Sequence, residues 1–447
     1  MAGYGSGVSA LPKRPRVVLV YADRVGAAMG GVGIRAVELG RVLADALGAE
    51  VTIAAAAHDG GDVGLPVATF APHAPAALDR LLAGADAVVA QPLWPLAMRR
   101  LRRSGARLVF DLYDPEVFGT LEHFRGRDRR LRALMGAFAA DRIADALRSG
   151  HHVICASERQ RDLWLGALLG ARLVTPDAYD ADPSLRERVA VVPYGVPATP
   201  PAPGGGIPRA RLGIGPDDEV VLWNGGLWSW FDAATAIRAI AVLRRRRPRA
   251  RLLFMGASSA PPARAASAAA RALARELGLL GEAVVFNDAW VPYAERGAWL
   301  RDAACALSTH VDHLETRFSS RTRLLDCFWA GLPIVCTAGD ELAARVERDG
   351  LGATVPPGDP DAVAAALERV LARGRAAYGP ALAAAAADHA WPRVAAPLVR
   401  WLGDPRRPAP MPRRRLSRPL GERLRTAAYC ALAAPLAAAR IRPPQLR

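Results

Sequence analysis

Short apolar runs alternate with longer amphipathic stretches along the first half of the chain, and this alternation limits the fold to one class. Five runs rich in β-branched residues are expected to be buried strands: RVVLVY at 16–21, EVTIAAAA at 50–57, ADAVVA at 85–90, ARLVFD at 106–111 and HHVICAS at 151–157. Each run is followed by apolar residues at helical spacing. Strands that are apolar on both faces and joined by helices form a parallel sheet covered by helices. We therefore predict an α/β protein.

The same alternation starts again in the second half, after a stretch rich in proline and glycine at 198–208. The second set of expected strands covers 218–226, 250–256, 282–288, 303–308 and 332–337, with helices such as 232–247 and 320–330 between them. We predict two doubly wound, Rossmann-like domains with parallel sheets, which face each other across a cleft. In such sheets, ligands bind at the carboxyl ends of the strands.

The length of the chain agrees with two domains, because 447 residues exceed what one hydrophobic core usually serves. The expected bounds are 1–197 for an amino-terminal, acceptor-side domain, 198–208 for the linker, 209–390 for a carboxyl-terminal, donor-side domain, 391–403 for a final helix that crosses back and 404–447 for a basic tail. Each domain is long enough to bury a core of its own.

Composition disfavours several classes of protein. Apolar residues make up 51% and charged residues 23% of the chain, which is ordinary for a globular protein. The five cysteines are scattered and form no CxxC pair, so we expect reduced thiols and no metal site. The amino-terminal residues lack the apolar core of a signal peptide, and no run of about 18 apolar residues predicts a membrane span. We expect a cytoplasmic protein.

The positive charge is concentrated at the carboxyl end. Residues 405–447 hold eleven arginines and one acid, Glu422, and so carry +10 of the net charge of +16. The chain shows no basic reading surface with interleaved aromatic residues, and we expect no nucleic-acid partner. Two interpretations of the tail stay open. It is either an interfacial helix that binds anionic lipid on the inner face of the plasma membrane, or a solvated arginine-rich tail.

Four segments lie where an expected strand gives way to an expected helix, a place where backbone amides can hold an anion. The first, DRVGAAMGGVGIR at 23–35, contains Gly30, Gly31 and Gly33. A dinucleotide site is disfavoured there, because the strand ends well before Gly31 and Ile53 stands where a ribose-binding acid is required. We interpret these glycines as a loop that lets a donor substrate approach the backbone. The alternative is a plain tight turn.

The second segment is WNGGLWSWFDAATAIRA at 223–239. Gly225 and Gly226 remove the side chains that would block a phosphate, and amides at the following helix start would point at it. Trp228 and Trp230 either stack on a ligand or pack beside the sheet.

The third segment, RLVFDLYDPEVF at 107–118, places Asp111 and Asp114 at or just after a strand end. We expect Asp111 to face the cleft. Asp114 is either part of the same site or the N-cap of the next helix.

The fourth segment contains SSRTRLLDCFWAGLP at 319–333. Asp326 stands within an otherwise apolar helix and needs hydrogen-bond donors, either protein groups or the vicinal hydroxyls of a ribose. Arg321 and Arg323 stand in the expected first turn, where cations are unfavourable unless an anion such as a diphosphate offsets the helix dipole. The alternatives are a solvated arginine pair and a structural bridge from Asp326 to an arginine.

Residues 324–371, LLDCFWAGLPIVCTAGDELAARVERDGLGATVPPGDPDAVAAALERVL, resemble the donor-domain signature of retaining glycosyltransferases of family 4. In that signature an acid precedes a helix end with Gly-x-Pro, a strand, a turn and a later Pro-Gly-Asp. The amino-terminal glycine loop, the PYGVP stretch and the final helix are similar to the GT-B architecture of the same family. The likeness covers roughly residues 16–402.

The resemblance implies transfer of a sugar from a nucleotide-diphosphate sugar to an acceptor, with retained anomeric configuration and without a metal or other cofactor. In this family an acid at the position of Asp326 holds the ribose, and a glutamate eight residues earlier contacts the donor sugar. Phe318 stands at that earlier position here, so the role would pass to Glu315.

The family's arginine and lysine after the first strand of the second domain are also absent, and WNGGLW stands in their place. Lys13 is the only lysine in the chain. The diphosphate is then expected to be held by Arg321, Arg323 and glycine-loop amides, which would stabilise the leaving group. The acceptor would be oriented by side chains of the third segment, namely Asp111, Tyr113 or Asp114.

We therefore expect a glycosyltransferase that acts on a glycan or lipid-linked acceptor in the synthesis of cell-envelope polysaccharide or glycoconjugate. Phe318 and the missing lysine keep a second possibility open, a non-catalytic subunit that binds nucleotide sugars or polysaccharide. A third is a phosphorylase or epimerase of GT-B fold. His310 and His313, which flank the fourth segment, are interpreted as structural.

Overall fold

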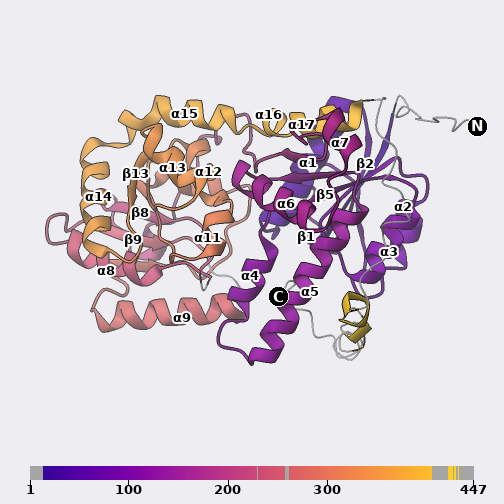
Figure 1. Ribbon diagram of the computed structural model, residues 1–447. Coiled ribbons are helices and arrows are strands. Elements are labelled where there is room, and N and C mark those ends of the chain that lie inside the picture. Colours follow the sequence, from indigo (N-terminus) through magenta and orange to yellow (C-terminus); the bar gives the residue numbers. More distant parts are fainter. Residues whose placement is uncertain are drawn as a thin grey trace, which may run out of the picture. The chain divides into compact units, whose positions relative to one another are not determined.

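The computed structural model describes residues 14–228, 230–256, 261–404, 421–425, 427–428 and 431. The chain divides into two compact units, each built around one parallel sheet (Figure 1). Of the described residues, the first unit comprises those up to Leu121, Gly126–Pro193 and those from Trp391 onward, and the second comprises Glu122–Arg125 and Tyr194–Ala390.

The sheet of the first unit has seven parallel strands in the order β3-β2-β1-β4-β5-β6-β7. The strands are β1 (Arg16–Val25), β2 (Glu50–His58), β3 (Val67–Thr69), β4 (Ala87–Ala90), β5 (Arg107–Asp111), β6 (His152–Cys155) and β7 (Val189–Val191). The order reverses between β1 and β4, which is the topological switch point of a doubly wound sheet.

Helices pack on both faces of this sheet. They are α1 (Gly31–Leu47), α2 (Ala77–Leu82), α3 (Pro95–Arg103), α4 (Glu116–His123), α5 (Arg129–Ser149), α6 (Glu158–Gly170), α7 (Pro176–Ala181), α16 (Trp391–Val394) and α17 (Ala396–Gly403). Side chains of a strand alternate between its faces. Val18 and Val20 of β1 join the core that holds Leu101 of α3 and Ile143 of α5, whereas Leu19 lies on the opposite face against α1.

The sheet of the second unit has six parallel strands in the order β10-β9-β8-β11-β12-β13. The strands are β8 (Glu219–Trp223), β9 (Ala250–Phe254), β10 (Val284–Phe286), β11 (Cys305–Ser308), β12 (Ile334–Thr337) and β13 (Gly352–Val355). Its switch point lies between β8 and β11, so the loops that follow these two strands are where a ligand is expected.

The helical elements of the second unit are η1 (Ala210–Leu212), α8 (Ala233–Leu243), α9 (Pro261–Glu276), α10 (Arg296–Asp302), α11 (Leu314–Phe318), α12 (Thr322–Ala330), α13 (Glu341–Arg348), α14 (Pro360–Arg373), η2 (Arg375–Tyr378) and α15 (Gly379–Asp388). Local sequence sets several of their ends. Asp232, Asp340 and Asp359 cap α8, α13 and α14 by accepting a backbone N–H three residues on. Gly331 ends α12 in the left-handed conformation, with φ of 63°.

The structure confirms the prediction of two α/β domains with parallel sheets. Three strands were not predicted: β3, β7 and β13. Each is an edge strand of three or four residues. Most residues of β3 and β13 are only partly buried, so these segments form no apolar run of the kind that indicates a buried strand.

The described residues from Trp391 onward belong to the first unit. The final helix predicted at 391–403 is present as two short helices, α16 and α17, separated at Ala395. Most of the predicted interfacial tail lies outside the described residues. In the part that is described, Glu422 forms an ion pair with Arg148 and Arg425 forms one with Asp141, both on α5.

Candidate functional site

The loops after β8 and β11 run side by side at the switch point of the second unit. Phe231 and His310 form an antiparallel bridge. The Asp232 N–H donates to the Thr309 carbonyl at 3.0 Å, and the Val311 N–H donates to the Trp230 carbonyl at 3.2 Å. Backbone pairing therefore fixes these loops to each other at the place where a doubly wound sheet binds its ligand.

Gly225 and Arg323 meet at the start of this pair of loops. Gly225 has φ of +128°, a conformation that side chains other than glycine rarely adopt. A Cβ atom there would lie 3.2 Å from Nη2 of Arg323, which itself donates to the Gly226 carbonyl at 3.0 Å. The predicted donor-binding residues Gly225, Gly226 and Arg323 are thus brought together.

The Arg323 guanidinium has no carboxylate in an ion pair among the described residues. It lies 3.8 Å from the centroid of the Phe231 ring and 5.5 Å from that of Trp223. Its Nη1 is buried without a hydrogen-bond partner. Burial lowers the pKa of this group, because a charge is costly in a poorly solvated place. A bound anion would supply the missing partner.

Arg321 lies two residues earlier but has a different environment. Its Nε is 2.6 Å from Oδ2 of Asp340, and both side chains are 1% exposed. Its Nη1 donates to the Thr337 carbonyl at 2.8 Å. Arg321 is therefore tied to the end of β12 and to the residue that caps α13. Nε and Nη2 are both buried without a hydrogen bond, although Nε belongs to the ion pair with Asp340. The predicted role of Arg321 in binding diphosphate stays a prediction.

Asp326 forms the structural arginine bridge that the sequence left open as an alternative. Nε of Arg296 donates to Oδ1 of Asp326 at 3.1 Å, and the guanidinium lies between the rings of Tyr293, at 3.6 Å, and Trp329, at 4.7 Å. Burial would lower the pKa of Arg296, but the Asp326 carboxylate outweighs it and raises that pKa. Asp326 keeps 26% of its side chain exposed, and its contact with a ribose stays a prediction.

Glu315 lies on the short helix α11, where it is buried, and its Oε2 is 3.9 Å from Nδ1 of His313. His313 caps this helix, since its Nδ1 accepts the Thr316 N–H at 3.2 Å. His310 is 2% exposed. Burial and the charges of nearby arginines lower its pKa well below the ordinary value, so the ring is neutral. The role of Glu315 in contacting the donor sugar stays a prediction.

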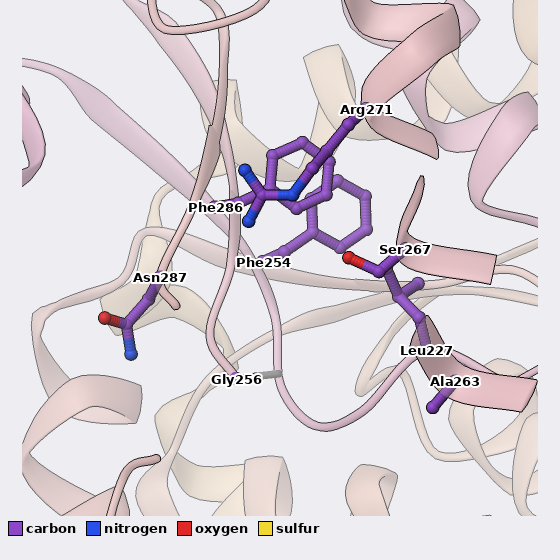
Figure 2. Close-up of a pocket in the computed structure, with 8 residues that line it drawn as sticks. All are labelled: Leu227, Phe254, Gly256, Ala263, Ser267, Arg271, Phe286 and Asn287. Atoms are coloured by element: carbon purple, nitrogen blue, oxygen red, sulfur yellow. The ribbon is translucent and has the colours of Figure 1, made fainter. Parts of the chain in front are cut away.

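A small pocket lies next to this loop pair, at the carboxyl ends of β9 and β10 (Figure 2). Phe254 and Phe286 stack at its base with centroids 4.5 Å apart, and the Arg271 guanidinium lies 4.3 Å from the centroid of Phe286. The rest of its lining consists of Leu227, from the glycine loop, and Gly256, Ala263, Ser267 and Asn287. Aromatic and apolar walls with a few polar groups are typical of a small-molecule site.

Three residues of the predicted glycine loop of the first unit make contacts within that unit. Ala27 and Ala28 donate their N–H groups to the carboxylate of Asp59, each at 2.8 Å. A Cβ atom at Gly33 would lie 2.3 Å from the Arg24 carbonyl oxygen, so Gly33 allows α1 to approach β1. Gly30 is the N-cap of α1 and has open space where a side chain would begin. Gly31 is the first residue of α1.

Asp111 ends β5 in a fully buried ion pair with Arg35 of α1. Nε of Arg35 is 2.6 Å from Oδ2 of Asp111, and both side chains are 0% exposed. The Tyr21 hydroxyl donates to the same oxygen at 2.7 Å. Burial and the Asp111 charge raise the pKa of Tyr21. This geometry gives Asp111 a structural role in joining α1 to the sheet, and a direct contact with an acceptor stays a prediction.

Asp114 follows in the loop before α4 and is exposed. Desolvation by the surrounding protein raises its carboxyl pKa to about 6. The Asp114 side chain is in contact with water, and screening by this water reduces the rise in its pKa. Tyr113 lies beside it, with the Arg35 guanidinium 4.9 Å from the centroid of its ring.

Sequence reasoning missed the residues that complete these contacts. Arg296 and Asp340, which pair with Asp326 and Arg321, carry no signal of their partners because the paired residues lie far apart or on separate elements. Asn224 follows β8, and its side chain amide donates to the Arg323 carbonyl at 2.8 Å. Its position directly before the glycine pair was the one available clue.

The described residues contain neither a metal-binding cluster nor a membrane-spanning helix. No three His, Cys, Asp or Glu side chains in this part of the chain are grouped as a metal ion would require. No helix within the same residues has both the length and the apolar character needed to cross a bilayer.

Comparison with protein families gives a match for the second unit. Residues 218–373 match the family model of group 1 glycosyl transferases. A sequence comparison with curated proteins gives no match. The matched range runs from the start of β8 to the end of α14 and contains every predicted donor-binding residue of the second unit.

Solved structures similar to this chain are GT-B glycosyltransferases. WaaG, a glycosyltransferase involved in lipopolysaccharide biosynthesis, has 16% identity and a TM-score of 0.57, over 86% of this chain and 99% of its own. HepE of Anabaena, in complex with UDP and glucose, has 15% identity and a TM-score of 0.62, over 87% and 99%. OtsA has 15% identity and a TM-score of 0.60, over 88% and 100%. The chain has the GT-B fold predicted from its sequence.

Proposed function

We propose that the protein transfers a sugar from a nucleoside-diphosphate sugar to a glycan or lipid-linked acceptor, with retention of configuration and without a metal. The observation that carries this proposal is the half-buried guanidinium of Arg323 beside Gly225 and Gly226, whose Nη1 has no hydrogen-bond partner and which forms no ion pair with a carboxylate of the described residues. It lies at the switch point of the unit that matches group 1 glycosyl transferases. A cation in this position is unfavourable until an anion binds.

The reaction breaks the bond between the anomeric carbon and the diphosphate oxygen, and a new bond forms from that carbon to an acceptor hydroxyl on the same face. The acceptor's proton passes to an oxygen of the leaving diphosphate, so no enzymic nucleophile is required. Negative charge grows on the diphosphate as the bond breaks. Arg323 and the amides near Gly225 would stabilise that charge where it develops.

The pocket beside Leu227 extends this proposal to the rest of the donor. It lies next to the glycine loop and has stacked aromatic rings at its base (Figure 2). We assign the nucleobase to this pocket, since a flat ring suits an aromatic wall. Asp326 would then hold the ribose through the part of its carboxylate that Arg296 leaves exposed, and Glu315 would contact the sugar.

Ligand-observed NMR with UDP, GDP and ADP tests donor binding. The parent protein is expected to bind one of these diphosphates, and Arg323→Met is expected to weaken that binding at least tenfold, since a hydrogen bond to a charged group is worth about 1.5–3 kcal/mol. Arg238→Met, on the exposed side of α8, is the matched control and should bind normally. Failure of all three diphosphates to bind would refute the proposed donor site.

A second candidate is a non-catalytic subunit that binds nucleotide sugars. Phe318 favours it, because an aromatic ring stands where the resemblance implies a glutamate. The two candidates differ in turnover. A transferase releases free nucleoside diphosphate slowly from its donor even without an acceptor, whereas a binding subunit leaves the donor intact over the same time.

The acceptor and the cellular site belong to the same proposal. A role in cell-envelope polysaccharide or glycoconjugate synthesis would place the enzyme at the inner face of the plasma membrane, with residues 405–447 against anionic lipid. The test is sedimentation with vesicles that contain anionic lipid, comparing the full chain with a chain that ends at Asp404. Equal sedimentation of both would refute the membrane contact.

A further inference from the structure

We propose that His313 donates a hydrogen bond from its Nε2–H to the donor diphosphate, in place of the lysine that the resemblance implies after the first strand of the second unit. The inference rests on the proposed function and assigns one more ligand to the same site. It adds a binding role to the structural role of this histidine, because capping accounts for one ring nitrogen only.

The position of the ring hydrogen follows from the cap of α11. The Thr316 backbone N–H donates to Nδ1 of His313 at 3.2 Å. A nitrogen that accepts a hydrogen bond carries no hydrogen, so in the neutral ring the hydrogen is on Nε2. The helix cap therefore fixes both the tautomer and the orientation of the imidazole. Nε2 is buried without a hydrogen-bond partner.

Other unsatisfied groups surround the same loop pair. Nη2 of Arg321, Nη1 of Arg323 and the indole N–H of Trp223 are also buried donors without a partner. Arg323 lies against the Phe231 ring, which packs on the His310 ring with centroids 4.7 Å apart. Arg321 donates to the carbonyl of Thr337, whose hydroxyl accepts the His310 N–H at 3.1 Å. Both arginines therefore lie beside the loop that carries His310 and His313. Buried polar groups are almost always hydrogen-bonded, and a group of several unpaired donors indicates an absent acceptor.

A diphosphate matches this set of donors better than a neutral ligand does. Its oxygens accept hydrogen bonds in several directions, and they carry the negative charge that would pair with the Arg323 guanidinium. An imidazole, unlike an ammonium group, can donate a hydrogen bond in its uncharged form. A lysine in its place would bring a third cation into the same poorly solvated space, which is unfavourable in the unliganded protein.

The decisive variant is His313→Asn, because asparagine can still cap α11 but has no group in the position of the imidazole Nε2–H. Its side-chain oxygen can accept the Thr316 N–H, and asparagine is among the preferred N-cap residues. Affinity is measured by ligand-observed NMR for the nucleoside diphosphate that the parent protein binds and for the corresponding nucleoside without phosphate. We expect diphosphate affinity to fall roughly tenfold or more, with nucleoside affinity unchanged.

His313→Ala removes both the cap and the donor and serves as the comparison for stability. Its melting temperature should fall, whereas that of His313→Asn should match the parent. Diphosphate affinity of His313→Asn within twofold of the parent would overturn the inference, and so would an equal loss for the nucleoside. If Arg323→Met still abolishes diphosphate binding in that case, the proposed donor site stands and only the role of His313 fails.

Discussion

Arg321→Met separates a structural arginine from a ligand-binding one. The substitution leaves Asp340 buried, at 1% side-chain exposure, without its cationic partner. Breaking a buried ion pair in this way costs about 3–5 kcal/mol. The Thr337 carbonyl also loses its donor, which adds about 1 kcal/mol. Asp340 keeps the N–H of Ala343 at 2.9 Å, so we expect a total of about 4 kcal/mol.

Hydrogen exchange measured by mass spectrometry is the suitable assay, because a protein of two units does not unfold in one step. Peptides that contain β12 and the start of α13 report on the contacts that Arg321 makes. A loss of about 4 kcal/mol corresponds to an increase in exchange of roughly a thousandfold where opening of the second unit limits exchange. Arg238→Met is again the exposed control and should leave exchange unchanged.

The double variant Arg321→Met/Asp340→Asn tests the cause of the loss. Asparagine keeps the cap of α13 and removes the unpaired charge, so it should restore at least half of the lost stability. Protection of β12 in Arg321→Met within threefold of the parent would refute the reasoning. It would mean that Asp340 finds other donors, and that Arg321 is free to bind diphosphate as the sequence predicted.

Three further predictions address packing, backbone conformation and pH. Gly33→Ala should destabilise the first unit by about 1–3 kcal/mol in thermal unfolding, since its Cβ would meet the Arg24 carbonyl at 2.3 Å; a melting temperature equal to the parent's would contradict this. Gly225→Ala is strained at φ of +128° and crowds Arg323, so NMR titration should show weaker diphosphate binding, and unchanged affinity would count against the loop as a phosphate site. His310 has a lowered pKa in the folded protein, so below about pH 6.5 the unfolded chain takes up a proton that the folded chain does not, and the free energy of unfolding decreases as the pH is lowered. In His310→Gln, denaturant titrations should show a smaller decrease of this free energy between neutral and acidic pH. An unchanged decrease would mean that other groups cause it.

The two sheets were predictable because their central strands are long enough to show a pattern. β1 and β2 are buried apolar runs of ten and nine residues, and their neighbours repeat the signal. The edge strands β3 and β13 were missed because most of their residues are only partly buried and form no apolar run. Hydrogen bonds to a neighbouring strand, which the sequence does not display, determine their conformation.

The candidate site was predictable in its position but not in its pairing. The glycine pair at 225–226 and the arginines at 321 and 323 follow strands β8 and β11, and the rule that ligands bind at these strand ends located them. The sequence could not show which arginine already has a carboxylate. Asp340 is one of several acids downstream of Arg321, and only the turn after β12 brings it within 2.6 Å.

The difference between Arg321 and Arg323 has a consequence for stability. Arg321 contributes to folding without a ligand, because Asp340 compensates its charge. The partly buried Arg323 forms no ion pair with a carboxylate of the described residues, and its Nη1 has no hydrogen-bond partner. A destabilising charge in such a place is retained where function requires it. The unliganded second unit should therefore be less stable than its packing allows. A diphosphate at one hundred times the parent's dissociation constant should stabilise the parent by about 2.7 kcal/mol. At the same concentration the gain should be smaller in Arg323→Met, because that variant binds the diphosphate more weakly.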